Sequence, residues 1–419
     1  MALDAEEYRR RRAHREARRA KQRARRRRTV IKLAVAAVAL IGCGVLIFAV
    51  TRPGNKAPQM TQPPITPEAT GPIQSQEKTT TIHLAATGDL NITDRVIAAG
   101  GSNMDYSKVF MDVAYLLGNA DVATVNFEGV LCGAPYGSSK SAPQALIQAL
   151  ARSGVDLVQL ANSYSIYKGV SGLATTIDNV RAAGMEPLGV YANREQYKAG
   201  EGYVLCNVRG IKIAFVAFTK GMDGMALPAG SENCVNVLYT DYASNYQKVD
   251  EKGITAVLKA AEKEKPDITI AMLHWGSEFN DTLSTSQLKI RDLLLKNGVD
   301  AIIGTHSHYV QKIEYNKDDN TFVAYSLGDF LGDAKRAGTE YSVILDLEIT
   351  KDNETGKTTI SGYSYTPVFT VAEEGKLLRV VRIREAIAAY EAGYIDRVSE
   401  ETYEAMKYAL QRIEARIAG

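Results

Sequence analysis

The chain has 419 residues, of which 23% are charged, and a formal net charge of +2 at pH 7. The near-balance hides an asymmetry: residues 1–32 hold 14 Lys and Arg against 4 Asp and Glu, whereas the remainder holds 36 basic and 44 acidic residues. Because the long acidic part has no general attraction for a polyanion, its composition argues against nucleic-acid binding there.

At the N-terminus a basic segment, residues 1–32, precedes an apolar one. Residues 33–50 carry no charge over eighteen positions, which is long enough for a transmembrane helix. We expect an uncleaved single-pass anchor at 33–51 with the basic segment in the cytoplasm, since Lys and Arg flanking a span favour that side. Two alternatives stay open: a nucleic-acid-binding arm, and a cleaved signal peptide, although the exit of the segment lacks an A-x-A pattern.

The next segment, residues 52–80, contains six of the twelve prolines and few large apolar residues. This composition is typical of a solvated, partly extended linker. We therefore expect everything after it to form an extracytoplasmic part. The cysteines of that part, Cys132, Cys206 and Cys234, match no metal-binding spacing and leave one disulfide possible.

From residue 81 onward, short β-type runs alternate with helical ones. Glycine closes each of three helical runs, as at many helix C-caps, and the alternation predicts βαβ units with a covered sheet. The helical runs are 141–154, 172–184 and 284–298. The strands are expected at 81–89, 121–129, 155–162, 211–218, 267–276, 299–308 and 321–330.

Polar residues gather where these strands end. In open α/β sheets ligands bind outside the carboxyl ends of the strands, and carboxylates with imidazoles there are the usual metal ligands of a chain without a cysteine cluster. The residues concerned are Asp89, Asn126, Glu128, Asn162, His274, His306 and His308.

His306 and His308 are two of only five histidines. In an extended segment residues two apart point the same way, so we expect both imidazoles to reach one locus. His83 lies inside a strand rather than at its end, and we expect it to be structural.

The C-terminal tail, 376–419, is expected to end in an amphipathic helix beginning after Ser399. Its apolar stripe steps by three and four residues. Such a stripe is most often a face that docks on its own domain, and a partner-binding helix is the alternative. The stripe consists of Tyr403, Met406, Leu410, Ile413 and Ile417.

Several segments resemble motifs of the bacterial CapA family, which is associated with poly-γ-glutamate capsule synthesis and is similar in fold to the calcineurin-like metallophosphoesterases. The resemblance covers roughly residues 81–370, with the domain itself placed at 81–375. The motifs are "TGDLNITDR", "VNFEG", "LHWGSEF", "LLKNGVDAIIGTHSHYVQKIE" and "AYSLGDF".

The resemblance implies an α/β fold, a four-layer α/β/β/α metallophosphoesterase-like sandwich, here preceded by one transmembrane helix. It also implies one or two divalent ions at the strand ends, manganese, iron or zinc, that would clamp a phosphate-like group and lower the pKa of a bound water. Asp89 would be a ligand, Glu128 would bridge two ions, and the imidazole ligands would be His274, His306 and His308.

One motif departs from the family. Where the family has "ANNHS-x-DYG", this chain has "ANSYSIYKG", so Ser163 replaces the ligating amide, Tyr164 the histidine and Tyr167 the aspartate. Tyrosine, with a reference pKa of about 10, cannot replace an imidazole in acid–base exchange near neutrality without a large shift. Asn162 is an alternative amide ligand.

Two further polar residues are possible additions to the site. Asn91 falls where classical metallophosphoesterases place a histidine. Asp329 replaces the Asn of "YSLGNF", and its negative charge would favour a cation and oppose an anionic substrate.

Three functions are compatible with this pattern. We expect a membrane-anchored protein of poly-γ-glutamate capsule or cell-envelope polymer biosynthesis or export, binding metal with weak or no hydrolase activity. The alternatives are an active metal-dependent hydrolase of phosphoester or amide bonds in a cell-surface polymer, and a metal-free scaffold. Expected partners are the membrane through 33–51, an anionic polymer and other capsule-synthesis membrane proteins, not nucleic acid. Lys220 and the basic residues of 333–340 could serve an anionic polymer.

Overall fold

The structure is a computed structural model, and it describes residues 78–394 and 398–418. The expected basic segment 1–32, the anchor 33–51 and nearly all of the linker 52–80 lie outside the described residues. Within those ranges, no helix combines the length and the apolar character needed to cross a membrane.

The described chain forms two mixed β-sheets, so the predicted α/β class is confirmed. The eight-stranded sheet runs β14 (Arg379–Arg382), β13 (Thr358–Val371), β12 (Tyr341–Asp352), β1 (Thr79–Asn91), β2 (Val122–Glu128), β3 (Leu157–Gln159) and β4 (Glu186–Leu188), with β11 (Asp329–Leu331) paired to β1. The six-stranded sheet runs β5 (Tyr203–Val208), β6 (Ile211–Thr219), β7 (Ile268–His274), β8 (Ala301–Thr305), β10 (Thr321–Ala324) and β9 (Ile313–Asn316).

Nine helices lie among the described residues, and the three expected ones are α4, α5 and α8. The full set is α2 (Asp94–Ala98), α3 (Ala114–Asn119), α4 (Gln144–Ser153), α5 (Gly169–Ala182), α6 (Arg194–Gly200), α7 (Glu251–Lys263), α8 (Thr285–Lys296), α9 (Ile383–Glu391) and α10 (Glu400–Ala418). The glycine after each expected helix has a positive φ, from 85° to 112°, as a helix C-terminus often requires.

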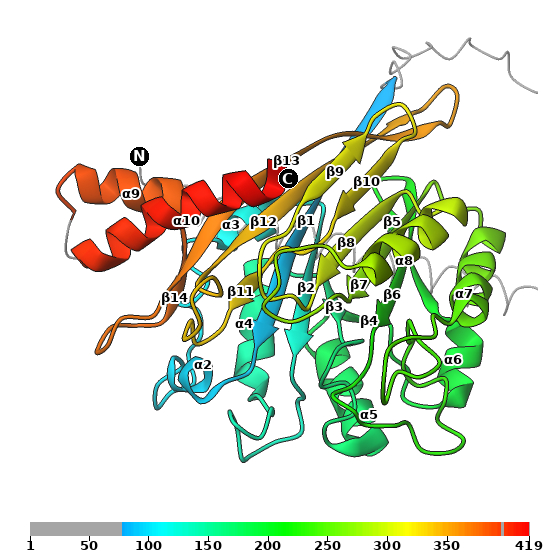
Figure 1. Cartoon of the computed structure of the whole chain (residues 1–419), viewed down its shortest axis with the longest axis horizontal. Helices are drawn as coiled ribbons and strands as arrows, with labels where there is room; N and C mark the ends of the chain where they lie inside the picture. The colour runs from blue at the N-terminus through cyan, green and yellow to red at the C-terminus, as the bar shows by residue number, and fades with distance from the viewer. Residues whose placement is uncertain (1–77, 395–397, 419) are drawn as a thin grey trace, which may run out of the picture. The chain divides into compact units, whose positions relative to one another are not determined.

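The helices and the two sheets are arranged in layers (Figure 1), and three apolar clusters fill the spaces between these layers. One cluster joins α3, α4 and α5 to the outer face of the eight-stranded sheet, and another joins α7 and α8 to the outer face of the six-stranded sheet. The third fills the space between the two sheets. Strand β6 shows the alternation that makes this possible, because Ile213, Phe215 and Ala217 enter the inter-sheet cluster while Val216 and Phe218 face the helices.

An aspartate fixes the register at the start of four parallel strands. Asp121, Asp156, Asp267 and Asp300 each donate their backbone N–H to a carbonyl oxygen of the neighbouring strand at 2.7–2.9 Å. The carboxylate of each aspartate accepts the backbone N–H of that same neighbouring residue at 2.7–3.1 Å. This two-point contact aligns the strands at the edge opposite to the polar strand ends.

The C-terminal helices α9 and α10 lie side by side at one end of the molecule (Figure 1). Helix α10 buries Met406, Ala409, Ile413 and Ile417 in the inter-sheet cluster, against β12 and β13. The tail helix thus docks on its own domain.

The cysteines and His83 lie apart from the strand-end residues. Cys132, Cys206 and Cys234 are all free, so the one disulfide left open by the sequence is not formed. His83 lies within β1, with its Nδ1 atom 3.0 Å from Asp346 of β12.

Candidate metal centre

The carboxyl ends of β1, β2, β7 and β8 meet at one edge of the paired sheets. β1 and β2 belong to the eight-stranded sheet, whereas β7 and β8 belong to the six-stranded sheet. This edge therefore brings together two carboxylates and three imidazoles that are far apart in sequence: Asp89, Glu128, His274, His306 and His308. All five are buried.

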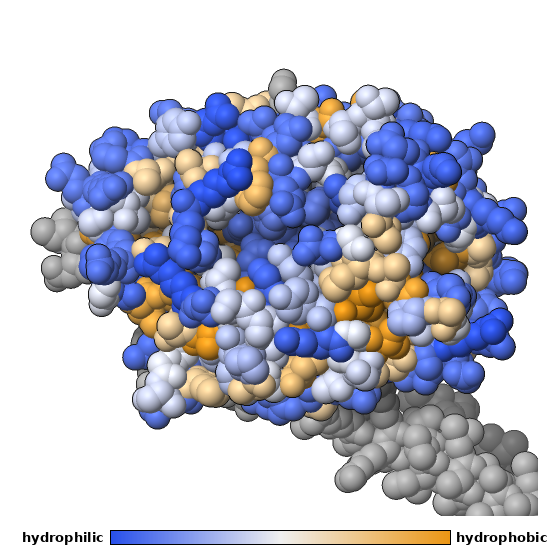
Figure 2. Space-filling view, turned by 60° about the horizontal axis from the view of Figure 1, so that its bottom comes forward, coloured by the Kyte–Doolittle hydropathy of each residue, from blue (hydrophilic) through white to orange (hydrophobic). Residues whose placement is uncertain are grey.

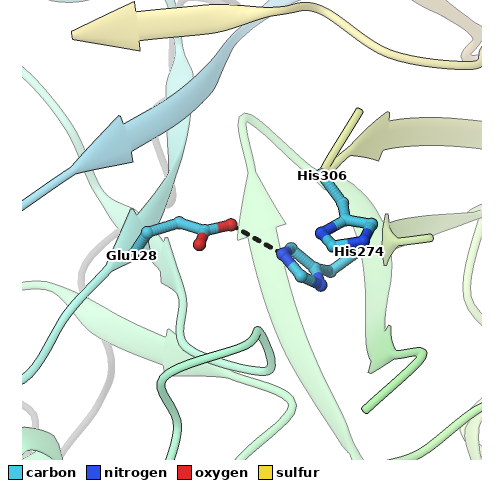
Figure 3. A group of neighbouring side chains, drawn as sticks. All are labelled: Glu128, His274 and His306. Atoms are coloured by element: carbon cyan, nitrogen blue, oxygen red, sulfur yellow. Dashed lines mark hydrogen bonds and ion pairs between the residues drawn. The ribbon is translucent and has the colours of Figure 1, made fainter. Parts of the chain in front are cut away.

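The first group consists of Glu128, His274 and His306, whose ligand atoms all lie within 4.8 Å of one another. His274 Nε2 is 2.6 Å from Glu128 Oε1. The two imidazole rings lie 4.2 Å apart, centroid to centroid. Figure 3 shows Glu128 pointing from its strand toward the two histidines of the other sheet.

The second group consists of Asp89, His308 and Asp329, within the same limit of 4.8 Å. His308 Nδ1 is 2.7 Å from Asp329 Oδ1 and 3.7 Å from Asp89 Oδ2. Asp329, which the sequence offered only as an addition, is a full member. β1 and β11 pair in parallel with Asp89 opposite Asp329.

A glycine permits this pairing. A Cβ atom at Gly88 would overlap the carbonyl group of Gly328, and the N–H of Asp89 donates to that carbonyl oxygen at 2.9 Å. The absence of a side chain at residue 88 thus lets the two carboxylates approach.

The sequence suggested that the two histidines after β8 reach one locus, but the structure places them in different groups. β8 ends at Thr305, and His306 and His308 have φ values of +88° and +59°. This left-handed backbone replaces the extended one and sends the rings into different groups, 6.2 Å apart. Such conformations are costly for residues other than glycine and cluster at functional sites.

The side-chain amides of Asn126 and Asn162 form hydrogen bonds next to the two groups, although neither residue belongs to them. Asn126 donates through Nδ2 to Asp89 Oδ1 at 2.6 Å and to Glu128 Oε1 at 3.0 Å. Asn162 donates to Asn126 Oδ1 at 3.0 Å and accepts the N–H of Tyr164. Both Asn162 polar atoms are therefore engaged with protein partners, and its role as an amide ligand stays a prediction.

Burial and mutual repulsion shape the charges of the site. Burial, with the charge of Glu128, raises the pKa of Asp89 well above its usual value. Burial also raises the pKa of Asp329. Burial would raise the pKa of Glu128 too, but the charge and hydrogen bond of His274 outweigh it and lower that pKa.

The histidines are driven in opposite directions. Burial would lower the pKa of His308, but Asp329 and Asp89 raise it to about 10. The pKa of His306 falls well below its usual value through burial and the positive charges of His274 and Lys220. His306 is therefore neutral, the form in which imidazole binds metal.

The residues fit a divalent cation. The Nδ1 atom of His306 is buried and has no hydrogen-bond partner, and an orphaned buried polar atom is costly unless something binds it. Three buried carboxylates, those of Asp89, Glu128 and Asp329, also lie together. Mixed imidazole and carboxylate ligands suit manganese, iron or zinc.

The residues of the altered motif lie beside the first group. Ser163 lines a cavity together with His306. Burial, and then the negative charges of Glu128 and Asp223, raise the pKa of Tyr164 far above its usual value. Tyr167 lies edge-on to Tyr164, with ring centroids 5.8 Å apart, and Asn91 hydrogen-bonds to Asp329.

The cavity beside His306 has a volume of about 230 Å³. The view in Figure 2 brings this end of the molecule forward, where hydrophilic residues surround a hollow between smaller apolar patches. The sequence pointed to Ser163, Lys220 and His306 of this cavity but not to its other lining residues, because no spacing links them. The lining residues are Ser163, Lys220, Gly221, Asp223, Tyr246, Ser277, Glu278 and His306.

Some contacts around the histidines also had no signal in the sequence. Thr219 Oγ1 lies 3.1 Å from His274 Nδ1. The ring of Phe279 stacks on the imidazole of His308, with the two ring centroids 5.0 Å apart. The guanidinium group of Arg336, from a loop distant in sequence, lies 3.9 Å from the centre of the Phe279 ring. These residues fix the orientation of two imidazoles from outside.

Comparison with known proteins assigns the family. Residues 83–334 match the model described as bacterial capsule synthesis protein PGA_cap. The capsule biosynthesis protein CapA of Bacillus anthracis is 26% identical over 257 residues, 59% of each chain. The PGA biosynthesis protein CapA of Bacillus subtilis is 27% identical over 226 residues, 53% of this chain and 55% of that protein.

The matched region thus spans little more than half the length of these curated relatives. Among solved structures, a novel phosphatase from Mycoplasma pneumoniae aligns with a TM-score of 0.44 and 13% identity, over 70% of this chain and 94% of that one. Since the family model covers more than half of the sequence, the chain belongs to the bacterial capsule synthesis protein (PGA_cap) family.

Proposed function

We propose that this chain is a membrane-anchored, extracytoplasmic protein of poly-γ-glutamate capsule or cell-envelope polymer biosynthesis or export. Family membership and the names of the two Bacillus relatives support the biosynthetic role. The anchor at 33–51, with residues 1–32 in the cytoplasm, is proposed from the sequence. An anionic cell-surface polymer and other capsule-synthesis membrane proteins are the proposed partners.

The domain is proposed to bind one or two divalent ions. The observation that carries this proposal is the pair of adjacent buried groups, Glu128–His274–His306 and Asp89–His308–Asp329. Bound there, a divalent ion supplies Lewis acidity and lowers the pKa of bound water. The protein supplies the ligands, and Asn126 orients two of their carboxylates. The bridging role that the resemblance implies for Glu128 stays a prediction.

Hydrolysis is proposed to be weak or absent because of Ser163 and Tyr164. The raised pKa of Tyr164 keeps its hydroxyl group protonated near neutral pH. It can donate a hydrogen bond, but it cannot exchange protons with substrate as an imidazole would. Loss of a general acid–base group typically costs about 10²–10⁴ in rate.

An active hydrolase is the second candidate, and one observation favours it. The first group is open to a cavity through His306, so a substrate could reach the proposed ions. A scaffold without metal would have no use for three histidines and three carboxylates held in buried contact.

Metal content tests the proposal. The purified full-length protein, supplied with manganese, iron or zinc, should contain one or two ions per chain by mass spectrometry. If both groups are filled, His274→Ala and Asp329→Ala should each lose one ion. His83→Ala, which changes a histidine outside both groups, is the matched control. No ion under metal-replete conditions would overturn the proposal.

Activity separates the two candidates. We expect little turnover of a generic phosphodiester or of a γ-linked glutamate peptide by the parent protein. Ser163→Asn combined with Tyr164→His should raise that rate by about 10²–10⁴. High turnover by the parent, left unchanged by the double substitution, would favour the active hydrolase.

A further inference from the structure

The cavity beside His306 carries both signs of charge. Among the described residues that line it, Lys220 is basic, and Asp223 and Glu278 are acidic. The remaining side chains offer two hydroxyl groups, one phenol ring and the imidazole of His306. A cavity with one cation and two anions around it is a poor match for a purely anionic ligand.

Lys220 is held in a fixed position. It follows β6, and its backbone N–H donates to the carbonyl oxygen of His274 at 2.8 Å. Its Nζ atom donates to Gly276 O at 2.8 Å and lies 4.6 Å from the centre of the Tyr246 ring. An ammonium group has three N–H donors, so two are left for a ligand in the cavity.

The positive and negative charges lie on different segments of the chain. Glu278 follows β7, and Asp223 follows Lys220 by three residues. Burial raises the pKa of the Tyr246 phenol, and the negative charges of Asp223 and Glu278 raise it further. Asp223 and Glu278 are exposed, whereas Lys220 is half-buried and His306 is buried. The cavity is therefore basic at its inner end and acidic toward solvent.

The size of the cavity limits what it can hold. Its volume of about 230 Å³ is below the roughly 300–1,000 Å³ of sites for drug-sized ligands. It has room for one residue-sized group beside His306 and not for several units of a polymer. The buried Nδ1 atom of His306, which lacks a protein partner, is a further point at which something other than protein is to be bound.

We propose that this cavity binds a zwitterionic, amino-acid-like group, with a carboxylate on Lys220 and an ammonium group on Asp223 and Glu278. The substrate class is then a peptide-like chain that presents a residue with a free amino group. The positive charge of that amino group explains why two acidic residues lie in a cavity that would otherwise take an anionic polymer. The inference rests on the proposed function, because it assumes that the polymer binds at this same cavity.

Three small probes test this assignment on the full-length protein supplied with metal. L-Glutamate, N-acetyl-L-glutamate and glutarate each carry two carboxylates, so the binding of carboxylate to the ions is common to all three, and binding of the free amino group to an ion is recognised by a preference that survives substitution of the two acidic residues. Only L-glutamate carries an ammonium group. By calorimetry we expect it to bind at least tenfold more tightly than either of the others.

Variants identify the residues responsible. Asp223→Asn combined with Glu278→Gln should remove the preference for L-glutamate, while Lys220→Met should weaken all three probes. Asp318→Asn, an exposed acid in the loop between β9 and β10, is the matched control and should change nothing. Equal affinities for the three probes, or a preference that survives the double substitution, would overturn the inference.

Metal content, measured on the same samples, keeps the two proposals apart. Lys220, Asp223 and Glu278 belong to neither metal group, so their variants should keep their ions. Ions without any preference for L-glutamate would sink this inference alone. A preference for L-glutamate in a protein without ions would sink the proposed metal function and leave this inference standing.

Discussion

Glu128 and His274 lie 2.6 Å apart, Oε1 to Nε2, although they end strands of different sheets. Both side chains are almost completely buried, at 2% and 0% exposure. This contact ties β2 to β7 directly at the edge where the proposed metal groups lie. The sandwich is joined there by a polar pair, whereas the cluster that fills the space between the sheets is apolar.

His274→Leu should destabilise the metal-free protein strongly. The substitution keeps the volume of the side chain roughly constant but leaves the buried carboxylate of Glu128 without the imidazole, and only the amide of Asn126 still donates to it among the contacts described above. Breaking a buried pair in this way typically costs about 3–5 kcal/mol. Urea unfolding in the presence of a chelator measures the loss. Lys407→Ala, which removes an exposed pair with Glu404, is the control, and it should cost no more than about 1 kcal/mol.

Added metal should stabilise the folded protein. A ligand that binds only the folded state at 100 times its dissociation constant contributes about 2.7 kcal/mol. We therefore expect manganese or zinc to raise the unfolding temperature and a chelator to reverse the rise. The shift should shrink in His306→Ala and in Asp329→Ala, each of which removes a ligand from one group. An unfolding temperature indifferent to metal would argue that neither group binds it.

Asn126→Ala should weaken metal binding without removing a ligand. Its amide donates to both Asp89 and Glu128, and loss of such an orienting partner typically costs about 10–100-fold in metal affinity. Competition with a fluorescent chelator measures the change. Asn179→Ala is matched in chemistry, because Asn179 donates to Leu131 O away from the site, and it should leave the affinity unchanged. Equal affinities for both variants would remove Asn126 from the site.

The gathering of five polar side chains at one sheet edge could be predicted from the sequence, because strand ends are a local signal. An apolar run that stops at Asp89, Glu128 or His274 places a polar side chain at the sheet edge. The role of Asp329 could not be found in that way, since it depends on β11 pairing with β1 across some 240 residues of chain. The expected strand 321–330 in fact divides into β10 of one sheet and β11 of the other.

For a similar reason, the backbone conformation of His306 and His308 could not be predicted from the periodicity of the sequence. Their positive φ values are set by tertiary contacts, among them the hydrogen bond from the N–H of His306 to Asp89 Oδ2 at 3.0 Å. The cavity residues Asp223 and Glu278 lie in irregular loops, where no repeat indicates which way a side chain points. Strands β12, β13 and β14, by contrast, were missed although two of them are long.

Because helix α10 docks on the domain, we expect substitutions on its buried and exposed faces to differ in their effect on the free energy of unfolding. Ile413 is fully buried in the cluster between the sheets, so Ile413→Ala should destabilise the protein by about 2–5 kcal/mol. Tyr408 lies on the same helix and is 58% exposed, so Tyr408→Ala should stay within about 0.5 kcal/mol of the parent. Urea unfolding checks both. A small effect at Ile413 would mean that α10 contributes little to the fold.

Asp300 should make stability depend on pH. Burial raises the pKa of its carboxyl group to about 6, above the value of about 3.9 expected in the unfolded chain. The stability that this group contributes is therefore fully present below about pH 4 and is lost as the pH rises through about 6. A shift of about two units corresponds to roughly 3 kcal/mol at most.

Asp300→Asn should remove this dependence while keeping an oxygen to accept the N–H of Thr269, which Asp300 Oδ2 accepts at 2.8 Å. Relative to the parent, the variant should gain about 1–3 kcal/mol in unfolding free energy between pH 4 and pH 7.5. Urea unfolding at the two pH values measures the gain, with the exposed Asp318→Asn as control. If the difference between variant and parent were the same at both pH values, the carboxyl group of Asp300 would have to be charged throughout, and the two-point contact at the start of β8 would tolerate that charge without cost.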